Sequence, residues 1–182
     1  MGLLTSLIQS ERGNQYPYAE SIPAWAAVGA SSVQNANNVV IQRMPRLIDP
    51  LPVAKVRLYV IATSGNLDVG VYTFDGTTWT LQSSSGSTAV GSATTVQTVS
   101  MLTTYVVQPG VDWYIGLSAD NTTATFQRTA AGVAAIFAAG PVGLSMAFKA
   151  SSFPLATNAT SFVAAGLTLT NTFAFWLRAS EV

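Results

Sequence analysis

Four aspartates, Asp68, Asp75, Asp112 and Asp120, are the side chains of this sequence best suited to acid–base chemistry. Hydrolysis of a glycosidic bond needs two carboxyl groups that face each other across the bond, about 5–10 Å apart. Asp75 and Asp120 stand beside glycine and asparagine, a setting typical of turns in which aspartate accepts hydrogen bonds from its own backbone. Asp112 follows a Pro-Gly turn. We therefore expect structural roles for these carboxylates, and a glycan hydrolase that uses a pair of them remains an alternative.

Other catalytic chemistry has few candidate residues. The chain contains no histidine and no cysteine, so the commonest general base, the commonest metal ligand and every thiolate are missing. A serine nucleophile would need Lys55 or Lys149 as its base, and nothing in the sequence singles out either lysine. Calcium could bind aspartate and asparagine in turns, but no dense acidic loop is present. The sequence predicts no enzymatic activity, no catalytic residue, no metal and no cofactor.

Aromatic side chains are candidates for a binding role. Tyr72 and Tyr114 lie opposite the apolar faces of their expected strands, and Trp79 follows a hairpin turn. Exposed rings at these positions would stack on sugar rings, so we name the three residues as possible carbohydrate contacts. We favour packing in a core or between subunits for these rings, because aromatic side chains bury large areas.

Alternating apolar and polar residues predict the strands that position these side chains. Turn signals at Asp75-Gly76, Pro109-Gly110 and Asp120-Asn121 separate them, and residues 83–88, rich in serine and glycine, are expected to form an exposed loop. The pattern predicts an all-β, jelly-roll-like antiparallel β-sandwich of about eight strands. The strands are expected within residues 38–44, 56–62, 67–72, 78–81, 94–101, 113–119, 144–149 and 173–178.

The first 25 residues differ from the rest. Residues 3–9 could form a short apolar helix, and the prolines and aromatics that follow indicate an extended N-terminal arm. We divide the chain into this arm (residues 1–25) and a β-sandwich domain (residues 26–182). The arm could dock the domain on another protein, or it could pack on its own domain or on a sister subunit. Its expected anchors are Leu3, Leu7, Tyr16, Tyr18 and Trp25.

Charge is scarce in this chain of 182 residues. Only 9% of the residues are charged and 49% are hydrophobic, whereas about 25% are charged in an average soluble protein. Either protein neighbours cover much of the surface, or serine and threonine keep it soluble. Net charge is zero and no basic stripe is present, which argues against nucleic-acid binding. The uncharged residues 130–147 are interrupted by glycine and proline, so we expect a loop and strand in an oligomer interface and no membrane span.

Two segments carry a resemblance to a known class of proteins. Residues 67–79 read LDVGVYTFDGTTW, and residues 108–120 read QPGVDWYIGLSAD. Together they resemble the jelly-roll modules of structural proteins in tailed bacteriophage virions, namely capsid decorations and tail fibres. The resemblance covers residues 54–128 and brings no catalytic motif with it.

This resemblance implies a homotrimer that is made in the host cytoplasm and displayed on the virion exterior. Its partners would be copies of itself and the capsid or tail proteins of the same virion. We expect a non-enzymatic capsid decoration or other exterior component fixed by its arm, because the chain is short and has no shaft-like repeat. The alternative is a tail-fibre module that binds a receptor or a host surface glycan.

Overall fold

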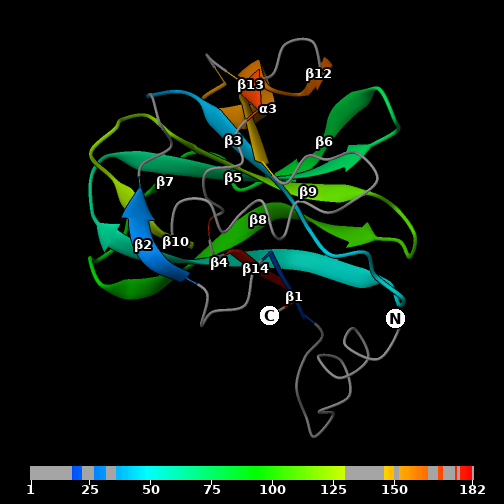
Figure 1. The fold of residues 1–182 in the computed structure, drawn as a ribbon, viewed down its shortest axis with the longest axis horizontal. Helices are drawn as coiled ribbons and strands as arrows, with labels where there is room; N and C mark the ends of the chain where they lie inside the picture. The colour runs from blue at the N-terminus through cyan, green and yellow to red at the C-terminus, as the bar shows by residue number, and fades with distance from the viewer. Residues whose placement is uncertain are drawn as a thin grey trace, which may run out of the picture.

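Figure 1 shows the computed structural model of the chain, in which antiparallel strands form two layers. The structure describes residues 18–21, 27–31, 36–129, 146–149, 152–163, 168–169, 175 and 177–181. Strands dominate this part of the chain, and its helical residues form the single turn α3 (Leu155–Asn158). The predicted all-β, jelly-roll-like sandwich is thereby confirmed.

Sheet A is built around the long strand β4 (Leu51–Ala62), in which Val56, Leu58 and Val60 point to the same side. β8 lies along one edge of β4, while β14 and β10 follow each other along the opposite edge. β1 extends the sheet beyond β14, and β2 extends it beyond β10. The other strands of this sheet are β1 (Tyr18–Glu20), β2 (Ala27–Ser31), β8 (Thr95–Val107), β10 (Thr125–Thr129) and β14 (Leu177–Ser180).

Sheet B has the strand order β12-β6-β5-β9-β3-β11-β13, with β7 paired to β5. The predicted hairpin at Asp75-Gly76 joins β5 to β6, and Gly76 takes a φ of 106° there, which a residue with a Cβ rarely adopts. Its strands are β3 (Val39–Arg43), β5 (Asn66–Phe74), β6 (Thr78–Ser84), β7 (Thr88–Ala89), β9 (Trp113–Ala119), β11 (Met146–Lys149), β12 (Ser161–Val163) and β13 (Thr168–Leu169).

The main core fills the space between the two sheets. Alternate residues of β4, β5 and β9 point into it, among them Leu58, Val69 and Leu117, none of which is exposed. Period-two alternation explains this placement, because successive side chains of a strand point to opposite faces of its sheet.

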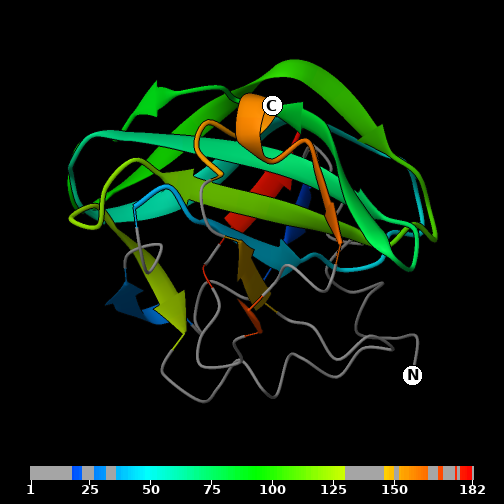
Figure 2. The same cartoon turned by 90° about the horizontal axis from the view of Figure 1, so that it is seen from above.

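A second apolar cluster lies on the outer face of sheet B. It is covered by the segment 152–163, which contains α3 and β12, and Figure 2 shows α3 (orange) over the strands of this sheet. Besides the pairing of β12 with β6, several hydrogen bonds hold the segment down. Among them, Leu155 N donates to Asp68 Oδ2, Tyr72 Oη donates to Ala159 O, and Leu81 N donates to Thr160 O. The central strands of sheet B are therefore buried on both faces.

The described structure has more strands than the sequence predicts. Six short strands were not expected, because segments of two to five residues give too little alternation to detect: β1, β2, β7, β10, β12 and β13. The expected exposed loop at residues 83–88 is wrong for Ser83, Ser84 and Ser85, which are buried. They are buried because Ser83 and Ser84 continue β6, and because Ser85 Oγ donates a hydrogen bond to Asp68.

Candidate functional site

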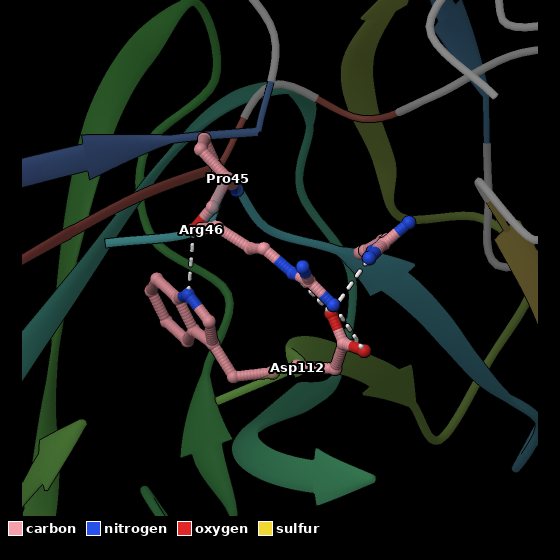
Figure 3. Close-up of polar contacts among 5 residues, drawn as sticks. Pro45, Arg46 and Asp112 are labelled. Atoms are coloured by element: carbon pink, nitrogen blue, oxygen red, sulfur yellow. Dashed lines mark hydrogen bonds and ion pairs between the residues drawn. The ribbon is translucent and has the colours of Figure 1, made fainter. Parts of the chain in front are cut away.

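Asp112 lies between two arginines at the start of β9. Its Oδ1 accepts hydrogen bonds from Arg43 Nη2 at 2.6 Å and from Arg46 Nε at 3.0 Å, and its Oδ2 accepts one from Arg46 Nη2 at 3.1 Å. Figure 3 shows the Asp112 carboxylate facing the guanidinium group of Arg46. Beside this cluster, Trp113 Nε1 donates to Pro45 O at 2.8 Å. These contacts fasten the end of β3 and the β3–β4 connection to β9.

The two arginines keep Asp112 ionised and donate hydrogen bonds to both of its carboxylate oxygens. The hydrogen bond from Arg46, followed by the one from Arg43, holds the pKa of Asp112 below its usual range. A carboxylate with a lowered pKa and donors on both oxygens is a weak general base. The arrangement is suited to holding a loop in place.

Asp68 lies on the outer face of sheet B and is completely buried. Ser85 Oγ donates to its Oδ1 at 3.1 Å, and Leu155 N donates to its Oδ2 at 2.9 Å. Burial raises the pKa of Asp68, and the hydrogen bonds from Leu155 and Ser85 oppose that rise. The carboxylate connects β5 with the Ser85 turn and with α3.

Asp75 stabilises its own turn, as the sequence predicts, whereas Asp120 bonds mainly to Asn66, which lies 54 residues away. Asp75 Oδ1 accepts hydrogen bonds from the backbone N–H groups of Thr77 and Thr78, which lower the pKa of Asp75. Burial acts to raise the pKa of Asp120, but hydrogen bonds from Asn66 and its neighbour Asn121 outweigh that effect, so the pKa of Asp120 is lowered. All four candidate carboxylates thus accept hydrogen bonds from nearby protein groups. Across the described ranges, no three acidic side chains gather into a metal site.

Tyr72, Trp79 and Tyr114, the possible carbohydrate contacts, do not expose their rings; they pack in a core, which is the interpretation that the sequence favours. Their exposed fractions are 0%, 1% and 1%. They do point away from the main core, as predicted, but the segment 152–163 covers them. Trp79 stacks between the rings of Phe74 and Phe162, with centroid distances of 4.1 and 5.9 Å, and Tyr114 meets the Trp79 ring edge-on. The three aromatics belong to the second apolar cluster.

Tyr18 is the expected arm anchor that lies within the described residues. It belongs to β1, which pairs with β14, and its ring lies under the Arg178 guanidinium at 3.6 Å. Tyr18 therefore packs on its own domain. The other expected anchors lie outside the described residues: Leu3, Leu7, Tyr16 and Trp25. The expected short helix also lies outside them. Of the uncharged segment 130–147, the structure describes Met146 and Ala147, which belong to β11.

Large apolar side chains are exposed on several parts of the described surface. Their exposed fractions run from 40% to 71%: Ile48, Val96, Leu102, Val106 and Val163. Three of them belong to β8. Exposed apolar side chains grouped on one element are typical of protein contact surfaces.

No family model matches the chain, and no curated protein matches it. Within the described ranges, no helix has the length and apolar character needed to cross a membrane.

Sequence reasoning missed two of these features. The arginine partners of Asp112 are 69 and 66 residues away in the chain, and no local pattern connects them. The exposed side of β8 did leave a signal, because residues 95–107 alternate without a single charged residue.

Proposed function

We propose that this chain is a non-enzymatic structural protein of a tailed bacteriophage virion. It assembles as a homotrimer on the particle exterior, where it decorates the capsid or forms another exterior component. Copies of the chain and neighbouring capsid or tail proteins are its partners.

The exposed apolar side chains of a charge-poor sandwich are the observation that carries this proposal. Ile48, Val96, Leu102, Val106 and Val163 are all at least 40% exposed, in a chain with only 9% charged residues. Burying such surface against protein is favourable by about 25 cal/mol per Å² before the costs of ordering. A chain that works within an assembly gains from this surface, whereas a free monomer would be prone to non-specific contacts.

The resemblance to virion jelly-roll modules supports the same function. Its two segments correspond to the β5–β6 hairpin and to the turn that leads into β9. β5 and β9 pair with each other over seven residues, from Leu67 opposite Ala119 to Thr73 opposite Trp113. The segments that carry the resemblance are thus neighbours in the middle of sheet B.

The carbohydrate-binding alternative has lost its candidate residues. Tyr72, Trp79 and Tyr114 are buried, so a glycan would have to bind elsewhere. The hydrolase alternative is also weakened, because each candidate aspartate is engaged by donors of its own chain.

The native mass of the purified chain tests this proposal. The full chain should be compared with a version that begins at Tyr18, because a cut after residue 25 would also remove β1 from sheet A. We expect the mass of a trimer for both, with assembly located in the β-sandwich. A full chain that remains monomeric at every concentration would contradict the proposal.

A further inference from the structure

The outer face of sheet A brings three cations together in a chain that has few. Lys55 and Arg57 point outward from β4, and Arg178 points outward from β14, because their neighbours along each strand lie in the main core. The register sets Arg57 directly opposite Arg178, and it makes Lys55 the diagonal neighbour of Arg178. Directly opposite positions lie about 4.5–5.5 Å apart and diagonal ones about 7–8 Å apart, within reach of long side chains. The three cationic groups can therefore meet above one point of the sheet.

Hydroxyl groups of β8 flank these cations. Thr98 lies opposite Arg57, and Ser100 lies opposite Lys55. Both residues are exposed, and they point outward because Val99 between them lies in the main core. We call this set the outer cationic site: Lys55, Arg57, Thr98, Ser100 and Arg178.

The acidic residue that the register places beside this site is Glu20. β1 lies next to β14 (Figure 1), and Glu20 is opposite Arg178. Its Oε1 is 3.8 Å from Arg178 Nε, which is too far for a hydrogen bond. Three positive charges less this one negative charge leave a net charge of +2 on this part of the face. Like charges directly opposite each other destabilise a sheet, so Arg57 and Arg178 need more compensation than Glu20 supplies.

Arg178 has hydrogen-bonding capacity that its neighbours do not use. Its Nε is buried and has no hydrogen-bond partner among the described residues. The ring of Tyr18 lies 3.6 Å from the guanidinium carbon, which is a contact with the face of the group. Contact with that face leaves the N–H groups at the edge of the guanidinium plane able to donate.

We propose that the outer cationic site binds an oxyanion of the phosphate class. The guanidinium groups of Arg57 and Arg178 donate to its oxygens, Lys55 supplies a compact positive charge, and the hydroxyls of Thr98 and Ser100 donate from the β8 side. Guanidinium groups match the oxygens of phosphate in geometry, and a dianion neutralises a net charge of +2. The bound ion also removes the repulsion between the two opposed arginines. This site does not depend on the assembly proposed above.

Titration of the full-length protein with inorganic phosphate, at constant ionic strength, tests the proposal. NMR signals of the arginine Nε–H groups report where the ion binds, and calorimetry gives the dissociation constant. We expect saturable shifts of the Arg57 and Arg178 signals, whereas the signal of Arg43, which is paired with Asp112 at the other sheet, should stay in place. A titration without saturable shifts at Arg57 and Arg178 would overturn the proposal.

Lys55→Gln and Lys149→Gln are matched variants, because each removes one positive charge and Lys149 belongs to β11 in sheet B. Circular dichroism would check that both fold. Loss of a charged donor predicts that Lys55→Gln raises the dissociation constant about tenfold and that Lys149→Gln leaves it within about twofold of the wild type. Arg57→Lys keeps the charge but loses the planar fork, so it should also weaken binding. Equal weakening by the two lysine variants, or wild-type affinity in Arg57→Lys, would mean that net charge alone attracts the ion, and the proposal would fall.

The phosphate group can belong to the free ion or to an organic monoester, and two more titrations separate these sources. Phenyl phosphate serves as the monoester. Tighter binding of phenyl phosphate than of inorganic phosphate would identify a monoester as the ligand, and the reverse order would identify the free ion. Acetate, which carries a single charge, should bind about tenfold more weakly than phosphate. Equal affinity for acetate and phosphate would contradict a site built for a dianion.

Discussion

Gly116→Ala tests how the outer face of sheet B is packed. Gly116 in β9 pairs with Gly70 in β5, and the ring of Tyr72 occupies the space that their missing side chains leave. A Cβ on Gly116 would lie 2.6 Å from Tyr72 Cε2 and 3.0 Å from Val39 Cγ2. The Tyr72 ring has little room to move, because it is fully buried, its hydroxyl donates to Ala159 O and it contacts Phe162.

Two opposing effects set the magnitude of this change. Overpacking a buried site typically costs about 1–3 kcal/mol. Replacing glycine by alanine also stabilises the fold by about 0.4–1 kcal/mol, because the unfolded chain has less conformational freedom. We therefore expect Gly116→Ala to lower the free energy of unfolding by about 1–2 kcal/mol. Gly91→Ala is the control, because its Cβ would meet nothing closer than Gln97, at 3.4 Å.

Urea unfolding followed by tryptophan fluorescence, at one fixed protein concentration, would measure the effect. A double-mutant cycle with Tyr72→Leu identifies its cause. If the clash with the ring is responsible, Gly116→Ala should cost at least about 1 kcal/mol less in the Tyr72→Leu background. Equal costs in both backgrounds, or a Gly116→Ala variant as stable as the wild type, would refute this account of the packing.

Three further changes test single polar groups. Burial raises the pKa of Asp68 above 3.8, so the wild type should gain stability relative to Asp68→Asn as the pH falls through the folded-state pKa. Denaturant unfolding of both proteins at several values between about pH 7 and pH 4 would test this. A difference in the free energy of unfolding that does not change with pH would contradict it. The opposite pH dependence holds at Asp112, because its pKa is lowered. Near neutral pH the free energy of unfolding of the wild type should exceed that of Asp112→Asn by about 1–2 kcal/mol, and this difference should disappear in acid. A difference that does not change with pH would count against the ion pairs. Ser118 Oγ is buried and has no hydrogen-bond partner among the described residues, so Ser118→Ala should change the free energy of unfolding by less than about 0.5 kcal/mol. Ser85→Ala loses the hydrogen bond to Asp68 and should cost about 1–2 kcal/mol. Similar losses in thermal unfolding of the two variants would argue against this assignment of hydrogen bonds.

Local alternation predicts the strands well and predicts their surroundings poorly. In β9 it places Trp113, Ile115 and Leu117 on the core side, where they lie. It also leaves Tyr114 on the opposite side, but that side is covered by Phe162 and the rest of the segment 152–163. A cover that begins 38 residues after Tyr114 in the chain leaves no trace in the period of the strand.

The four candidate aspartates also differ in whether their hydrogen-bond partners are close in sequence, and hence predictable, or distant. Turn chemistry is local, so the sequence predicts the role of Asp75 from its neighbours. The role of Asp120 was not predictable in this way, because its main partner is Asn66, 54 residues away. The partners of Asp112 and Asp68 come from other strands and from α3, and they depend on the order of strands in the sheets. The glycines of β5 and β9 were an available hint, since glycine inside a strand often marks a close approach of another group.

The stoichiometry of the full-length chain in low and high salt tests the central claim most directly. Sedimentation equilibrium would be run in about 0.15 M and about 1 M salt, where the Debye length falls from about 8 to about 3 Å. An interface made of uncharged, apolar surface predicts a trimer in both conditions. A monomer in both would contradict the proposed assembly, and a trimer that dissociates in high salt would contradict the claim that neutral surface holds it together.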